Sequence, residues 1–186
     1  MTNQPTILNL PNQITIARLI LSVAVFVLIP FGQFAAALVC FAVAAGTDWL
    51  DGYIARKYNL VTKLGRILDP FADKFLICGV FIYLAAESRS GIAAWMAVVV
   101  VGRELLVTVI RSFLEAEGTD FSAKMAGKLK MVFQCAAVIV SLLVLSMTSS
   151  PDWLDWTLLF CAWLAVLSTI YSGVGYVIAA TKLVQI

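Results

Sequence analysis

Six long apolar runs, separated by short polar connections, occupy most of this 186-residue chain. A transmembrane helix needs about 20 mainly apolar residues, so six such helices account for nearly the whole sequence. Hydrophobic residues make up 62% of the chain and charged residues 13%, whereas soluble domains have about 45–50% and about 25%. A chain this short cannot bury so much apolar surface in one soluble core. The sequence therefore excludes a soluble domain, a disulfide-linked secreted scaffold and a nucleic-acid-binding module.

We predict an all-α polytopic integral membrane protein with six transmembrane helices, forming a single domain over residues 1–186. The apolar runs are Ile14–Phe31, Gln33–Ala45, Pro70–Ala86, Ile92–Phe113, Leu129–Met147 and Trp156–Ala180. The second run continues into a polar stretch that reaches Tyr58 without a helix breaker. The first run lacks a basic segment before it and contains Arg18, so we interpret it as a retained helix rather than a signal peptide.

The distribution of basic residues predicts the topology, because lysine and arginine are enriched in cytoplasmic loops. With the N-terminus in the cytoplasm, the outward connections carry only Arg89. The inward segments then carry Arg56, Lys57, Lys63, Arg66, Lys74, Arg111, Lys124, Lys128, Lys130 and Lys182. Both termini are therefore expected to face the cytoplasm.

Four aspartates lie at the predicted cytoplasmic ends of the second and third runs. Asp48 and Asp51 are three residues apart, and Asp69 and Asp73 are four residues apart, so each pair lies on one face of a helix. A charged carboxylate at membrane depth is costly unless it is paired or ligated. The connection between the two helices is short, so the helices are expected to be antiparallel neighbours whose carboxylates converge.

The chemistry of these aspartates favours a metal site. Four converging carboxylates repel one another unless cations lie between them, and the chain contains no histidine. Ligand sets made only of oxygen favour the hard cations Mg²⁺ or Mn²⁺. Two such ions about 3.5–4 Å apart form a clamp for phosphoryl chemistry.

Small residues and one arginine accompany the aspartates. Gly52, Ala55 and Gly65 lie within one turn of them. They permit either tight helix packing or the close approach of a ligand to the backbone. Arg56 carries a guanidinium fork suited to phosphate, although it also fits a basic anchor at the cytoplasmic interface.

The dipeptide Asp69-Pro70 leaves the start of the third helix open. Proline at the first helical position with an aspartate N-cap is a favourable helix start, which would leave Asp69 off the helical face. Alternatively, the helix begins near Gly65 and continues through Pro70.

Taken together, residues 48–73 match the pattern DxxDGxxARx8GxxxDxxxD without a departure. This pattern resembles the signature of the CDP-alcohol phosphatidyltransferase family. The resemblance covers essentially the whole chain, since family members are also six-span membrane proteins of about this length. It implies that a CDP-linked lipid binds with its pyrophosphate on two divalent cations, and that an acceptor hydroxyl attacks the lipid-bearing phosphorus and releases CMP.

The resemblance also implies roles for the residues of the pattern. Asp48, Asp51, Asp69 and Asp73 correspond to the ligands of the two Mg²⁺ or Mn²⁺ ions, and Asp73 also corresponds to the general base. The elements that bind the nucleotide and pyrophosphate of CDP-diacylglycerol correspond to Gly52, Ala55, Arg56 and Gly65.

Three further segments resemble the branch of the family whose acceptor is glycerol 3-phosphate. These segments are residues 10–18, 102–104 and 127–130. The acceptor is a dianion, so basic residues near the metal site are expected to bind its phosphate. The candidates are Arg103, Arg111, Lys124, Lys128 and Lys130. Arg103 lies deep in an apolar run and either pairs with Glu104 or binds the acceptor phosphate.

Other functions stay open at this point. That branch usually has threonine where this chain has Met131, which keeps phosphatidylglycerol (as in cardiolipin synthase), serine and inositol phosphate open as acceptors. A divalent-cation transporter and a non-catalytic scaffold fit less well, because the aspartates lie at one membrane face and no inverted repeat is visible. The resemblance further implies a homodimer in a bacterial inner membrane, with membrane lipid and no nucleic acid as partners and with the active site facing the cytoplasm.

Overall fold

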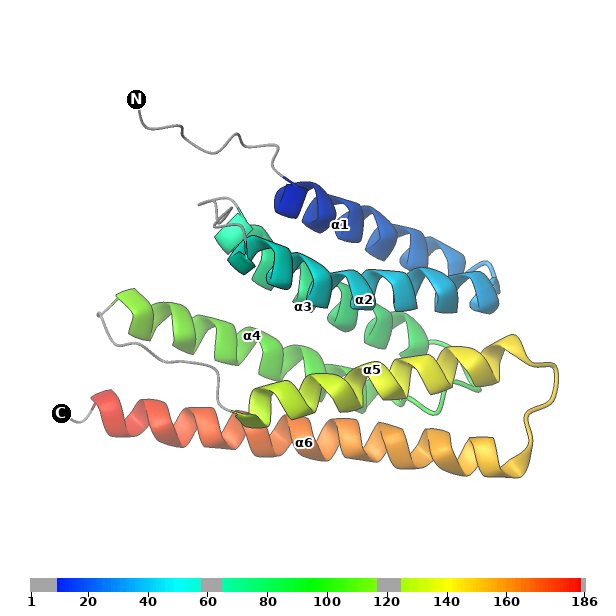
Figure 1. Cartoon of the computed structure of the whole chain (residues 1–186). Coiled ribbons are helices and arrows are strands. Elements are labelled where there is room, and N and C mark those ends of the chain that lie inside the picture. The colour runs from blue at the N-terminus through cyan, green and yellow to red at the C-terminus, as the bar shows by residue number, and fades with distance from the viewer. Residues whose placement is uncertain (1–9, 58–64, 117–124, 185–186) are drawn as a thin grey trace. The chain divides into compact units, whose positions relative to one another are not determined.

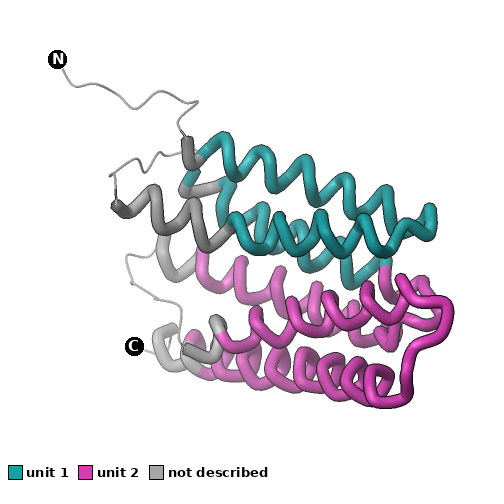
Figure 2. The backbone as a smooth tube through the Cα atoms, turned by 45° about the vertical axis from the view of Figure 1, so that its right-hand side comes forward, with its two compact units in different colours: residues 1–83 teal, residues 84–186 magenta. Residues whose placement is uncertain are grey.

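In a computed structural model, the described residues are 10–57, 65–116 and 125–184. They form six α-helices and contain no strand (Figure 1). The helices are α1 (Leu10–Leu28), α2 (Phe34–Lys57), α3 (Gly65–Ala85), α4 (Ala94–Ala116), α5 (Met125–Ser146) and α6 (Asp152–Val184). The prediction of an all-α chain with six helices is confirmed. The chain divides into two compact units, residues 1–83 and 84–186, coloured separately in Figure 2.

In the first unit, a tight turn joins α1 to α2. The N–H of Gly32 donates to the carbonyl of Ile29 (2.9 Å), and the N–H of Gln33 donates to the carbonyl of Leu28 (3.0 Å). This is the Schellman pattern, which needs a left-handed residue just beyond the helix. Gly32 fulfils that need with a φ of 70°. The turn makes α1 and α2 antiparallel.

Helices α1 and α3 run in the same direction, as their matched contacts show. The ring of Phe26 packs on Phe75 near the middle of α3, with centroids 5.2 Å apart, and on Tyr83 further along, at 5.5 Å. Thr15 contacts Asp69 at the beginning of both helices. Since α1 is antiparallel to α2 and parallel to α3, α2 and α3 are antiparallel, as the sequence predicts.

The faces of α1 are reversed relative to a helix of a water-soluble protein. Its inner face buries polar side chains, and Arg18 is only 1% exposed. Its outer face exposes aliphatic side chains, and Ile20 is 65% exposed. In water, the polar side chains would lie outside and the apolar ones inside. This reversal is expected where hydrocarbon is the outer solvent.

In the second unit, α5 packs antiparallel to α6, while α4 runs parallel to α6. Trp95 and Trp163 pack at the start of α4 and the middle of α6, with centroids 5.6 Å apart. Helix α6 follows Pro151, whose carbonyl accepts the N–H of Leu154 at 2.9 Å. Asp152 and Asp155 lie in its first turn, where the helix dipole favours negative charge.

Two helices of the described residues are long and apolar enough to cross a membrane over segments Leu129–Ser146 and Asp152–Ile178. Shorter apolar segments occupy Asn12–Leu28 and Phe34–Thr47. Together with the reversed faces of α1, these segments indicate a membrane protein.

Replacing Gly79 with alanine is expected to destabilise the first unit. A Cβ atom at this position of α3 would overlap the Phe26 ring, which Phe75 and Tyr83 hold in place. Overpacking of this kind costs roughly 1–3 kcal/mol. Thermal unfolding of the purified protein in detergent should show a lower midpoint for this variant.

Gly46→Ala in α2 is the matched control for Gly79→Ala. A Cβ atom there meets no described atom within 4 Å, and alanine is the better helix former by roughly 0.5–1 kcal/mol. Its midpoint should stay the same or rise. Equal midpoints for the two variants would contradict the packing of Phe26 against α3.

Candidate functional site

Helix α3 begins at Gly65 and contains Pro70. This selects the second of the two helix starts that the sequence leaves open. Pro70 lies beyond the first four residues of the helix, whose N–H groups have no intrahelical partner, so its missing N–H removes one i→i−4 hydrogen bond. Asp69 is therefore a helical residue, and it lies one turn before Asp73 on the same face.

Two polar residues of α1 hold these carboxylates. The hydroxyl of Thr15 donates to Asp69 Oδ1 at 2.6 Å. The guanidinium Nη1 of Arg18 donates to Asp73 Oδ1 at 2.8 Å. The side chain of Arg18 is 1% exposed and that of Asp73 is 30% exposed. The buried cation thus compensates the charge of a carboxylate that still reaches the surface.

Thr15 and Arg18 of α1 are not among the site residues predicted from the sequence, although the sequence contains a pattern that could have indicated them. Asn12, Thr15, Arg18 and Ser22 recur at helical spacing, and all four are buried. A stripe of polar residues through an apolar run indicates a face turned toward other polar groups. The sequence could not identify those groups, because they lie more than fifty residues further along the chain.

The second aspartate pair lies near the end of α2. Asp48, Asp51, Gly52, Ala55 and Arg56 all fall inside this helix, but their side chains lie outside the described residues. Because α2 and α3 are antiparallel, the end of α2 and the start of α3 belong to the same end of the unit. The convergence of the four carboxylates stays a prediction.

The described residues supply suitable oxygen donors for a hard cation. Asp69 and Asp73 present carboxylates from adjacent turns of one helix face, and Thr15 and Arg18 orient one oxygen of each. Among the side chains that the structure describes, no group of three His, Cys, Asp or Glu residues gathers at one place, and the side chains of Asp48 and Asp51 are not among them. The donor chemistry fits Mg²⁺ or Mn²⁺.

A buried ionic cluster joins the three helices of the second unit. Glu104 on α4 accepts hydrogen bonds from its neighbour Arg103, at 3.3 Å, and from Lys130 on α5. The side chains of these three residues are at most 9% exposed. Arg103 therefore makes the ion pair with Glu104 that the sequence offers as one alternative. Its role toward an acceptor phosphate stays a prediction.

Helix α6 completes this cluster. The Nη2 of Arg103 donates to the Ser172 hydroxyl at 2.6 Å, and its guanidinium lies 5.4 Å from the centroid of the Tyr176 ring. Gln134 of α5 donates to Thr169 of α6 at 3.0 Å. With one carboxylate and two cations, Arg103, Glu104 and Lys130 carry one net positive charge.

The structure describes less about the other three residues predicted to bind the acceptor phosphate. Arg111 lies on α4 and is exposed. Lys128 lies on α5, but its side chain is not described, and Lys124 lies outside the described residues.

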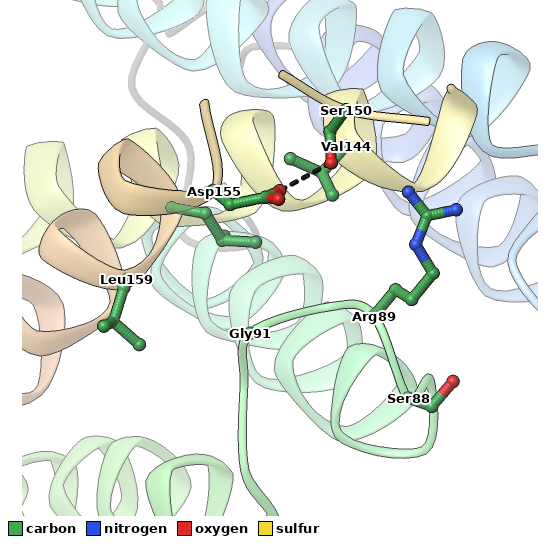
Figure 3. A pocket seen from close by; sticks show the side chains of 8 residues that line it. Ser88, Arg89, Gly91, Val144, Ser150, Asp155 and Leu159 are labelled. Carbon is green, nitrogen blue, oxygen red and sulfur yellow. Dashed lines mark hydrogen bonds between the residues drawn. The ribbon is translucent and has the colours of Figure 1, made fainter. Parts of the chain in front are cut away.

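A separate pocket of about 290 Å³ lies at the other end of the second unit, where the connections before α4 and α6 meet (Figure 3). Arg89 lines it and donates to the carbonyls of Met147 and Thr148. Asp155 also lines it and accepts a hydrogen bond from Ser150 at 2.6 Å. None of the predicted site residues lines this pocket.

Comparison with known proteins decides the family. The family model described as CDP-alcohol phosphatidyltransferase matches residues 8–171, which cover most of each unit. The chain belongs to this family. The resemblance found in residues 48–73 is thereby confirmed, and the family is one of transferases.

Several relatives match over nearly their full length. A Bacillus subtilis protein is 36% identical over 90% of this chain and 93% of its own length. A Rickettsia bellii protein is 37% identical over 94% and 96%, and an Escherichia coli protein is 32% identical over 92% and 94%. All three carry the name CDP-diacylglycerol--glycerol-3-phosphate 3-phosphatidyltransferase.

Replacing Glu104 with glutamine is expected to destabilise this phosphatidyltransferase-family chain. Arg103 and Lys130 would remain buried without their shared carboxylate. Removing one partner of a buried ion pair costs about 3–5 kcal/mol. The measurement is the thermal midpoint in detergent.

The double variant Glu104→Gln with Lys130→Met is the control for this prediction. It restores a single net positive charge to the cluster. Its midpoint should lie above that of Glu104→Gln alone. A double variant that is less stable than the single one would contradict the charge-balancing role of Glu104.

Proposed function

We propose that this protein transfers a phosphatidyl group from CDP-diacylglycerol to glycerol 3-phosphate, giving phosphatidylglycerophosphate and CMP. The observation that carries the proposal is the complete aspartate pattern of residues 48–73, whose second pair lies on one face of α3. The family match and the names of the relatives support the reaction and both substrates.

The transfer is a substitution at phosphorus. The acceptor hydroxyl oxygen attacks the lipid-bearing phosphorus of CDP-diacylglycerol, and a new P–O bond forms. The P–O bond to CMP breaks, and its electron pair leaves with CMP. Asp73 accepts the hydroxyl proton as general base. Arg18 holds Asp73 Oδ1, so the orientation of this carboxylate is set before the acceptor arrives.

We propose that Asp48, Asp51, Asp69 and Asp73 hold two Mg²⁺ or Mn²⁺ ions. Bound there, the ions supply charge stabilisation for the pyrophosphate and the departing CMP. Asp69 is oriented for this role by the Thr15 hydroxyl. Gly52, Ala55, Arg56 and Gly65 bind the nucleotide and pyrophosphate, with the Arg56 fork on phosphate oxygens.

The charge of the second unit supports an anionic acceptor. Arg103 and Lys130 place two cationic groups around Glu104, and the phosphate of an acceptor such as glycerol 3-phosphate is an anion that cationic groups bind. We propose Arg103, Arg111, Lys124, Lys128 and Lys130 as ligands of the acceptor phosphate.

The membrane arrangement is part of the proposal. All six helices span the membrane, and both termini and the active site face the cytoplasm, which the distribution of lysine and arginine supports. Residues 1–186 act as one domain, consistent with a family match that runs through both units. The family resemblance favours a homodimer in a bacterial inner membrane.

The test is CMP release by the purified protein in detergent with CDP-diacylglycerol and Mg²⁺ or Mn²⁺. Glycerol 3-phosphate, phosphatidylglycerol, serine and inositol phosphate serve as acceptors in parallel, and EDTA is the control. We expect release only with glycerol 3-phosphate and none with EDTA. Release with another acceptor alone would overturn the substrate, and Met131 would then be the first position to examine.

A further inference from the structure

We propose that Thr15 and Arg18 are positioning residues that fix the orientation of the Asp69 and Asp73 carboxylates. This inference deepens the proposed function and rests on it. The pattern of residues 48–73 includes no residue of α1, so Thr15 and Arg18 are an addition to the site that the pattern defines. Their role emerges from the packing of two helices.

The register of α1 against α3 allows both contacts at once. Thr15 and Arg18 are three residues apart, which corresponds to a rise of about 4.5 Å, and Asp69 and Asp73 are four apart, or about 6 Å. Because the two helices are parallel, the first donor meets the first acceptor and the second donor meets the second. The two distances, 2.6 and 2.8 Å, are those of well-formed hydrogen bonds to carboxylates.

In both hydrogen bonds the donor side chain is more deeply buried than the carboxylate that accepts. Thr15 and Arg18 are fully buried, whereas Asp69 is half-buried and the Asp73 side chain is 30% exposed. The donors therefore hold the carboxylates from the protein interior. In both contacts the acceptor is the Oδ1 atom, so each carboxylate has one oxygen fixed.

A role in stability alone explains these residues poorly. The Asp73 side chain is 30% exposed, so Arg18→Met does not leave a fully buried carboxylate, which is the case in which removing one partner of an ion pair is most destabilising. Thr15 can be replaced by valine of nearly the same shape. Groups that orient metal ligands, by contrast, affect metal affinity or activity by about 10–100-fold when they are removed. We therefore expect substitutions on α1 to change the site more than the fold.

The first experiment compares removal and conservative variants. Thr15→Val and Arg18→Met remove the two donors, while Thr15→Ser and Arg18→Lys retain a hydroxyl and a cation. We expect kcat for CMP release to fall by about 10–100-fold in the removal variants. The KM for CDP-diacylglycerol should change by less than about threefold, because the proposed role of these residues is to orient the carboxylates and not to bind the lipid. The conservative variants should recover most of the lost kcat.

Ser22→Ala is the matched control. Ser22 lies on the same buried face of α1, and its hydroxyl donates to the Arg18 carbonyl at 2.8 Å. Its removal takes a buried hydroxyl from α1 and leaves both carboxylate contacts in place. We expect its kcat to stay close to that of the original protein. A loss as large as that of Thr15→Val would mean that any damage to this face disturbs the site, and it would overturn the inference.

A second readout needs no turnover. The thermal midpoint is followed during a titration with Mn²⁺, and the concentration giving half of the shift measures cation binding. Thr15→Val should raise this concentration by about 10-fold or more, and Thr15→Ser and Ser22→Ala should not. Unchanged values of both kcat and half-shift concentration in Thr15→Val and Arg18→Met would overturn the inference.

The two readouts separate failure of the inference from failure of the proposed function. If the original protein releases no CMP with any acceptor, the proposed function fails, and the Mn²⁺ titration still decides whether Thr15 orients a cation ligand. If the original protein is active and both removal variants match it, the proposed function stands and the inference fails. If a removal variant does not fold, its conservative variant takes its place in the comparison. A conservative variant that folds but does not recover kcat also contradicts the inference.

Discussion

Asp73→Asn is expected to abolish CMP release while leaving most of the binding of CDP-diacylglycerol and cation intact. Asparagine retains an oxygen that accepts the hydrogen bond from Arg18, so the local packing survives. It cannot accept the proton of the acceptor hydroxyl. Loss of a general base reduces the rate by about 10²–10⁴-fold, and the measurement is kcat for CMP release beside Mn²⁺-dependent thermal stabilisation.

The two measurements on Asp73→Asn distinguish a base from a ligand. Lost turnover with retained Mn²⁺ stabilisation supports the base. If Mn²⁺ stabilisation disappears together with turnover, Asp73 acts chiefly as a metal ligand and its assignment as base is wrong.

Asp51→Asn is expected to lose both turnover and cation binding. Asp51 is the second aspartate of the pattern, three residues after Asp48 and next to Gly52, and an amide is a much weaker ligand for a hard cation than a carboxylate. We expect Mn²⁺ to cause no thermal shift in this variant over the range that stabilises the original protein, and CMP release to fall to the level found with EDTA.

Asp152→Asn is the control for Asp51→Asn. Asp152 is an exposed carboxylate in the first turn of α6, so its removal changes the net charge equally without touching the pattern. Both turnover and the Mn²⁺ shift should persist. Retained Mn²⁺ affinity in Asp51→Asn would contradict a metal site shared between α2 and α3.

The number and approximate positions of the helices could be predicted from the sequence, but the residues at which they begin and end could not. Each of the six apolar runs overlaps one helix, because the pattern of apolar residues reports which segments avoid water. The third run suggests a start at Pro70, whereas α3 begins at Gly65. Polar residues at a helix end do not show where the helix begins, because they fit equally well in the helix and in the connection before it.

The aspartate pattern was also visible in the sequence. Asp48, Asp51, Asp69 and Asp73 stand at helical spacing close together in the chain, and short-range spacing is the information that a sequence gives directly. The partners of these carboxylates could not be found in the same way. Arg18 and Asp73 are separated by fifty-five residues, and only the parallel packing of α1 and α3 brings them together.

The sequence by itself determined the membrane class, the six helices and the pattern that identifies the family, since composition, periodicity and local spacing are properties of the chain alone. The tertiary structure decided that Asp69 belongs to the helical face, that Thr15 and Arg18 hold the carboxylates of α3, and that Glu104 pairs with both Arg103 and Lys130. The physical reason is the same in each case. A buried polar group must find its partner wherever packing places one, and packing joins residues that are distant in the chain.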